Sequence, residues 1–334
     1  MFYSIVTLLG GLAVFVFGLK CISHGSESLI VGKKTESFSR LVKNPICGVL
    51  TGATVAGVTQ SSVAVSFITV GLVEAGVIPF SFSAPIIMGA NIGTTVTAQL
   101  ISLSGGVGGI VGAFSSIIGL LLGFSKNNRL KTLGETSIGL GLLFAGLDIM
   151  DSSITGLLSY GWFTWLFTAS NPLALFLNAM VLTSVIQSSS AVTGITVILA
   201  NKGVVDFNSA VFLTLGSNVG SCFSVILASL DKSIEARKAS CFNLCFNLLG
   251  AVLFFPFVLF CGDKITELFF TSGENIGRAI ANFHTVFNLI CAVVFLPFSK
   301  RLTNLISRIV TKEPKRAKYK VFYKTFKNKI RRFN

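Results

Sequence analysis

The chain carries the tripeptide Gln60-Ser61-Ser62 and repeats it as Gln187-Ser188-Ser189, at an offset of 127 positions (187 − 60). At the same offset the segment Gly89-Ala-Asn-Ile-Gly93 falls on Gly216-Ser-Asn-Val-Gly220. A general excess of apolar residues cannot align polar residues in this way. The match therefore indicates an internal repeat, a feature that determines the architecture of the whole chain.

The composition is that of a membrane protein. Of the 334 residues, 52% are hydrophobic and 12% are charged, whereas a water-facing surface is about 25–35% charged. We therefore predict a multi-pass protein of the cell membrane, with spanning helices of about 20 residues. The net charge of +14 does not indicate nucleic-acid binding, because residues 300–334 hold 13 of the 27 Lys and Arg residues and one acid.

We predict an all-α polytopic membrane protein with two inverted-topology repeats, each with a re-entrant helical hairpin and an interrupted transmembrane helix. The apolar segments 45–59 and 63–73 are each too short to cross a hydrocarbon core of about 30 Å, and the polar tip between them cannot face lipid. The Gly-x-Asn-x-Gly segments likewise interrupt apolar runs. The predicted parts are repeat 1 (1–131, with hairpin 44–75 and interrupted helix 79–103), repeat 2 (132–262, with hairpin 171–200 and interrupted helix 206–230), a last transmembrane helix (278–299) and a basic cytoplasmic tail (300–334).

The loop charges predict the orientation. Lys and Arg gather after the first span, at 126–131 and at 232–238, while the loops at 151–170 and 262–277 are mainly acidic. The seven predicted spans cover residues 5–19, 79–103, 106–124, 133–150, 206–230, 240–261 and 278–299. Because Lys and Arg are enriched in cytoplasmic loops, these spans place the N-terminus outside and the C-terminus in the cytoplasm. Three spans per repeat is an odd number, so the second copy enters from the opposite face, as in many secondary transporters.

The polar residues of the repeats predict an anion site combined with a cation site. Helix N-termini offer unpaired backbone N–H groups and the positive end of the helix dipole, and the tip serines add donors. Unwound carbonyls and side-chain oxygens suit Na⁺. The repeats hold no arginine inside the membrane, so a bound anion needs a co-bound cation, which predicts cation coupling. The alternative, that each Ser or Thr bonds back to its own helix, suits isolated residues such as Ser115 but not a cluster that occurs twice.

Three stretches carry a resemblance to a known family: Gln187-Ser188-Ser189-Ser190, Pro85-Ile-Ile-Met-Gly-Ala-Asn-Ile-Gly-Thr94 and Leu213-Thr-Leu-Gly-Ser-Asn-Val-Gly220. Over about residues 5–299 the chain resembles the type II sodium-dependent inorganic phosphate cotransporter family, in a short bacterial-type form without the C-terminal regulatory domain. The resemblance implies a symporter, not an enzyme, that imports inorganic phosphate by alternating access. Na⁺ would be the coupling ion, with no cofactor and no other metal. The first motif departs from the family pattern at Val63, where a third serine is usual.

The resemblance also implies which residues bind the substrates. The phosphate-binding residues would be Gln60, Ser61, Ser62, Gln187, Ser188, Ser189 and Ser190. The sodium-binding and cavity-lining residues would be Asn91, Thr94, Thr95, Asn218 and Ser221. His284 lies in a His-x-x-Phe-Asn sequence similar to one in this family, and it is either a proton-sensitive gate or a hydrogen-bonding partner in helix packing.

Several alternatives remain open at this point. The same fold could carry another small oxyanion, or the protein could be a non-transporting membrane scaffold or sensor. A serine hydrolase is disfavoured, because a serine nucleophile needs a base and neither histidine lies in the repeated motifs. Beyond phosphate and Na⁺, the predicted partner is the lipid bilayer, with anionic lipid at the basic tail. No nucleic-acid partner is predicted, and the oligomeric state, a dimer included, is left open.

Overall fold

The computed structural model describes residues 1–30, 42–104, 107–270 and 275–311, and within these ranges it contains helices and no strand, which confirms the all-α prediction. Part of the predicted basic loop after the first span and residues 312–334 of the predicted tail lie outside the described residues. The α-helices, in chain order, are α1 (Phe2–Ile30), α3 (Pro45–Thr59), α4 (Ser62–Glu74), α5 (Phe80–Gly93), α6 (Thr95–Ile101), α7 (Gly108–Gly123), α8 (Asn128–Leu157), α9 (Gly161–Thr168), α10 (Pro172–Ile186), α11 (Ser189–Asn201), α12 (Phe207–Ser229), α13 (Ile234–Phe269), α14 (Ile276–Phe295) and α15 (Ser299–Ile309).

Six helical segments in the described ranges are long and apolar enough to cross a membrane, which confirms a multi-pass membrane protein. They begin in α1, α5, α8, α12, α13 and α14. The seventh predicted span, over 106–124, corresponds to α7, whose 16 residues reach about 24 Å at 1.5 Å per residue and fall short of the hydrocarbon core. A seventh crossing is obtained only if α9 and α10, bent by 109° at their break, count as one span.

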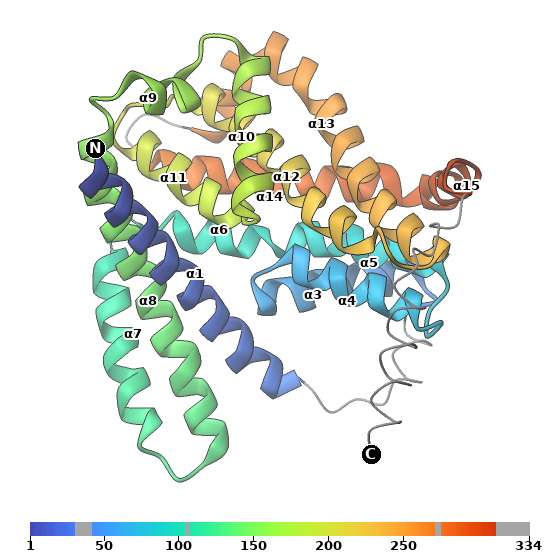
Figure 1. The fold of residues 1–334 in the computed structure, drawn as a ribbon, viewed down its shortest axis with the longest axis horizontal. Helices are drawn as coiled ribbons and strands as arrows, with labels where there is room; N and C mark the ends of the chain where they lie inside the picture. The colour runs from blue at the N-terminus through green and yellow to red at the C-terminus, as the bar shows by residue number, and fades with distance from the viewer. Residues whose placement is uncertain (31–41, 105–106, 271–274, 312–334) are drawn as a thin grey trace, which may run out of the picture.

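In Figure 1 the helices α1, α7 and α8 lie together at the lower left, α9 to α13 occupy the upper part, and α5, α6 and α14 run across the middle. α1 and α7 pack against α8 on one side, and α10 packs along α12, which in turn contacts α13. α3 packs along α5 in the same way as α10 packs along α12. In each copy the first helix of the hairpin pair therefore packs along the helix that follows the pair, so the two copies use the same local packing.

The two predicted hairpins are pairs of short helices with matching backbone geometry. Asn44 and Asn171 cap α3 and α10, each accepting a backbone hydrogen bond of 2.9 Å from two residues ahead. α3 ends at Gln60 and α10 at Gln187, with φ of 54° and 60°, the two non-glycine residues with positive φ in the described chain. These pairs agree with the predicted helical segments at 44–75 and 171–200. Their re-entrant placement in the bilayer, the inverted orientation of the copies and the repeat boundaries stay predictions.

The predicted interruptions at the Gly-x-Asn-x-Gly segments are wrong for the second copy and small in the first. α12 is a continuous helix across 206–230, and the break between α5 and α6 is one residue, Thr94, with helical backbone angles (φ −64°, ψ −19°). The glycines serve helix packing instead of helix termination. A Cβ on Gly216 would overlap the carbonyl oxygen of Phe176, and one on Gly89 would overlap that of Val49. Only glycine lets α10 and α3 approach their partner helices this closely.

Candidate anion-binding site

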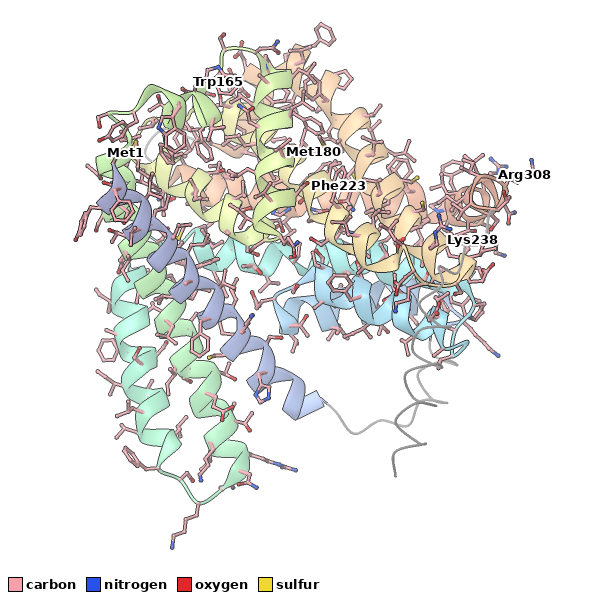
Figure 2. All side chains as sticks on the ribbon, in the orientation of Figure 1. Met1, Trp165, Met180, Phe223, Lys238 and Arg308 are labelled. Carbon is pink, nitrogen blue, oxygen red and sulfur yellow. The ribbon has the colours of Figure 1, made fainter. Side chains whose placement is uncertain are left out.

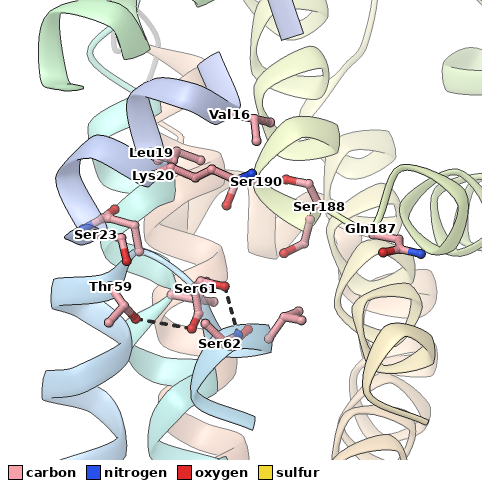
Figure 3. Close-up of a pocket in the computed structure, with 15 residues that line it drawn as sticks. Val16, Leu19, Lys20, Ser23, Thr59, Ser61, Ser62, Gln187, Ser188 and Ser190 are labelled. Carbon is pink, nitrogen blue, oxygen red and sulfur yellow. Dashed lines mark hydrogen bonds between the residues drawn. The ribbon is translucent and has the colours of Figure 1, made fainter. Parts of the chain in front are cut away.

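A polar cavity of about 290 Å³ lies where the two Gln-Ser-Ser clusters meet (Figure 3). Its walls come from α1, from the turn between α3 and α4, from the junction of α5 and α6 and from the turn between α10 and α11. Clusters that are far apart in the sequence therefore border one space. All predicted phosphate-binding residues and one predicted sodium-binding residue line it: Gln60, Ser61, Ser62, Gln187, Ser188, Ser189, Ser190 and Thr94.

Two helix N-termini open onto this cavity. Gln60 and Gln187 adopt the left-handed conformation, which reverses the chain at once, and the extended residues Ser61 and Ser188 then begin α4 and α11. The first backbone N–H groups of a helix have no intrahelical acceptor. A left-handed conformation held by a non-glycine residue costs of order 1–3 kcal/mol and is concentrated at functional sites. Its occurrence at both tips marks the cavity as the candidate site.

The tip serines have two distinct roles. The hydroxyl oxygens of Ser61 and Ser188 accept hydrogen bonds from the backbone N–H groups of Ala64 (3.1 Å) and Ala191 (3.3 Å), so they cap the helices. The hydroxyls of Ser62, Ser189 and Ser190 make no hydrogen bond within the described part of the chain, although all three residues line the cavity. These three hydroxyls are therefore the ones available to a ligand.

The two glutamines differ although their sequence positions correspond. The Gln60 side chain is buried, with Oε1 accepting from Thr97 Oγ1 at 2.8 Å and Nε2 donating to the carbonyl of Gly57. Gln187 is exposed, and its amide has no hydrogen-bonding partner among the described residues. Ser224 is the counterpart of Thr97 in the second copy, and its buried hydroxyl has no hydrogen-bonding partner among the described residues. The Gln60 amide is thus engaged in hydrogen bonds within the protein. The Gln187 amide has no such partner among the described residues and is available to a ligand.

The predicted sodium-binding residues are not gathered in one place. Thr94 lines the cavity, whereas the other four are buried in helix packing and do not line it. Three of these four donate to backbone carbonyls three or four residues earlier in the chain: Asn91 to Ile87 (2.9 Å), Thr95 to Ile92 (2.7 Å) and Ser221 to Asn218 (2.8 Å). The fourth, Asn218, shares a hydrogen bond of 3.0 Å between its Oδ1 and His284 Nε2. This contact supports the packing interpretation of His284, and the sodium roles stay predictions.

Sequence reasoning missed the contribution of α1 to the cavity. It ended the first span at residue 19 and assigned Lys20 to a cytoplasmic loop, but α1 continues to Ile30, and Lys20 and Ser23 line the cavity. No Gly or Pro occurs between Leu19 and Gly25 to end the helix, a signal that would have extended it past the apolar run. The wall of the candidate site therefore includes a lysine that the sequence analysis did not assign to it.

Fold and cavity together define a multi-pass helical membrane protein with a polar chamber among its helices. A family described as Na⁺/Pi-cotransporter matches residues 14–152 and 164–291. The chain therefore belongs to the Na⁺/Pi-cotransporter family. Membership confirms the predicted family, places the protein among phosphate transporters and excludes the enzyme alternative.

Individual relatives agree with this assignment. YqeW of Bacillus subtilis (strain 168) is 30% identical over 257 residues, which are 76% of this chain and 82% of YqeW. The "Putative inorganic phosphate export protein YjbB" of Escherichia coli (strain K12) is 25% identical over 314 residues, 93% of this chain but 56% of YjbB. The "Sodium-dependent phosphate transport protein 2B" of Homo sapiens is 35% identical over 102 residues, 30% of this chain and 15% of that protein. No solved structure matches the chain.

Proposed function

We propose that the protein is a sodium-coupled symporter that imports inorganic phosphate across the cell membrane by alternating access. The anion binds in the cavity between the two Gln-Ser-Ser clusters. The observation that carries this proposal is that the N-termini of α4 and α11 border the same chamber. Each helix N-terminus acts as about half a positive charge, and its free N–H groups suit the oxygens of a tetrahedral anion.

The uncommitted side chains fit phosphate in particular. The hydroxyls of Ser62, Ser189 and Ser190 can donate to phosphate oxygens, since none of them is used within the described chain. The dianion HPO₄²⁻ also carries one proton, which needs an acceptor. The amide oxygen of Gln187 is free to accept it, whereas that of Gln60 already accepts from Thr97. An acceptor at this position favours phosphate over sulfate, which has no proton to donate.

Sodium would bind beside the anion, with Thr94 as the candidate ligand at the cavity wall. We keep Asn91, Thr95, Asn218 and Ser221 as sodium candidates that act only if the helices around them rearrange. Each of these four side chains makes a hydrogen bond to its own helix or to a neighbouring helix. A cation next to the phosphate lowers the electrostatic cost of placing that anion among helices. This is the physical reason for coupling the two ions.

Uptake of radiolabelled phosphate into proteoliposomes, with and without an inward Na⁺ gradient, tests the proposal. We expect accumulation that requires Na⁺ and that unlabelled phosphate suppresses far more than sulfate does. Uptake of equal size without Na⁺ would refute sodium coupling. Suppression by sulfate as strong as by phosphate would refute phosphate selectivity and favour a transporter of another small oxyanion.

The direction of transport in the cell has a second candidate. Import follows from the resemblance to sodium-dependent cotransporters, whereas the name of the relative YjbB favours export. Cells that express the protein should gain labelled phosphate faster than control cells when Na⁺ is high outside. A faster loss from preloaded cells, with no gain in uptake, would establish export instead.

The proposed orientation has the C-terminus in the cytoplasm, where the basic tail contacts anionic lipid. The described start of this tail, α15, carries exposed Lys300, Arg301 and Arg308 opposite the buried Ile306. Figure 2 shows Arg308 at the same end of the molecule as Lys238, a residue of the predicted cytoplasmic loop. Truncation after Thr311 should weaken binding to anionic vesicles and leave phosphate affinity unchanged. A loss of Na⁺-driven uptake in correctly inserted protein would show that the tail takes part in transport.

A further inference from the structure

We propose that Lys20 is a specificity-determining residue of the phosphate site: its ammonium group supplies the second positive charge that makes the cavity prefer the dianion HPO₄²⁻ over the monoanion H₂PO₄⁻. This inference rests on the proposed function, since it assumes that phosphate binds in the chamber between the two tips. It goes further by assigning a charge preference to one side chain outside the repeated motifs.

Lys20 is placed for direct contact with an anion. It is the one charged residue among those that line the cavity. Figure 3 shows its side chain extending from α1 across the chamber toward Ser190. It forms no ion pair with any side chain that the structure describes, so no described carboxylate neutralises its charge. The exposed Lys20 ammonium therefore lies at the wall of the chamber near Ser190, at the start of α11.

The charge count explains why this residue decides between the two forms of phosphate. The N-termini of α4 and α11 contribute about half a charge each, or about one positive charge together. This positive charge of about one balances the charge of a monoanion, but it leaves about one negative charge of a dianion unbalanced. The Lys20 ammonium raises the local charge to about +2, which matches HPO₄²⁻. The sequence-based expectation that only a co-bound cation could balance the anion is therefore incomplete, because one positive charge is fixed in the protein.

Among the residues that the structure describes, no other titratable side chain lines the chamber. Among the described side chains of the same stretch of α1, Cys21 and His24 are the other titratable ones, and neither lines the cavity; the side chain of Glu27 lies outside the described residues. His24 Nδ1 lies 3.7 Å from Glu135 Oε2 of α8. The tip helix α3 contributes only Cys47, and α11 contributes no titratable residue. Phosphate itself changes from a monoanion to a dianion at its second ionisation. The pH dependence of binding should therefore follow the ligand and not the protein.

The expected effect can be estimated from Coulomb's law. At about 4 Å in water one pair of unit charges changes an equilibrium constant roughly fivefold. Replacing Lys20 by the neutral, similarly long glutamine should weaken monoanion binding about fivefold and dianion binding about 25-fold, since the dianion carries two charges. The affinity ratio of the two forms should therefore fall about fivefold. The Lys20→Arg change keeps the charge and should keep the ratio.

The test is equilibrium binding of radiolabelled inorganic phosphate to the purified full chain, at constant ionic strength, below and above the second ionisation of phosphate. The unmodified protein, Lys20→Arg and the loop control Lys126→Gln should bind more tightly at the higher pH, and Lys20→Gln should lose most of this gain. A pH gain in Lys20→Gln equal to that of the unmodified protein, with Ser62→Ala still weakening binding, would overturn the role of Lys20 alone. Absence of phosphate binding by the unmodified protein at both pH values would refute the proposed function itself. A loss of the pH gain in Lys20→Arg as well would also overturn the inference, because charge would not be the cause.

Discussion

Replacing Ser62 and Ser189 by alanine, singly and together, tests whether one anion is shared by the two helix N-termini. Neither hydroxyl has a hydrogen-bonding partner within the described chain, so the folded protein loses no internal hydrogen bond in either variant. A hydrogen bond to a charged group is worth about 1.5–3 kcal/mol. Each variant should therefore bind phosphate about ten- to a hundredfold more weakly. Because both serines would contact the same ligand, the combined loss should differ from the sum of the single losses.

The neighbouring serines provide the matched control for this experiment. Ser61 and Ser188 cap α4 and α11, so Ser61→Ala should lower the free energy of unfolding by about 0.5–2 kcal/mol, the usual cost of losing an N-cap. Ser62→Ala should leave the unfolding temperature unchanged. Phosphate binding and thermal unfolding are measured on the same purified samples. Strictly additive losses from Ser62→Ala and Ser189→Ala would show two independent sites, and unchanged affinity in both single variants would refute phosphate binding by these serines.

Three further predictions concern packing, pH and topology. Gly216→Ala should lower the free energy of unfolding by about 1–3 kcal/mol through overpacking, whereas Gly71→Ala, with open space around its Cβ, should be neutral or slightly stabilising in thermal unfolding. Hydrogen bonds from Ser233 lower the pKa of Glu74. These bonds therefore stabilise the fold above the pKa that the carboxyl group has in the unfolded chain. This stabilisation is lost as the pH falls through the lowered pKa that the group has in the folded protein. Unfolding temperatures of the unmodified protein and Glu74→Gln should therefore differ slightly near neutral pH and converge in acid, and a constant difference would contradict this. Lys126→Cys, in a background without native cysteines, should resist an impermeant external thiol reagent in whole cells, and its labelling would reverse the proposed orientation.

Local signals and the repeat agree at the two hairpins, so the sequence predicted the helix pairs and the tip residues that now border one cavity. Asn44-Pro45 and Asn171-Pro172 are an N-cap followed by the preferred first residue of a helix, and both start helices where expected. Glycine was the ambiguous signal. In Gly216-Ser-Asn-Val-Gly220 it was interpreted as a helix break, but its lack of a side chain serves the contact between α10 and α12. Whether a glycine ends a helix or allows close helix packing depends on the helix that packs against it. The local sequence around the glycine does not identify that helix.

The tip amides show a further limit of reasoning from symmetry. Gln60 and Gln187 correspond in sequence and share the same left-handed backbone, and their candidate partners Thr97 and Ser224 also correspond. In the first copy the amide and the hydroxyl meet at 2.8 Å, while in the second copy the glutamine is exposed and the buried serine hydroxyl is unpaired. A chain with two equal copies can hold them in different arrangements, because each copy packs against different neighbours. The repeat therefore predicts which atoms can pair, and the energies of the surrounding contacts determine which of the two equivalent hydrogen bonds is made.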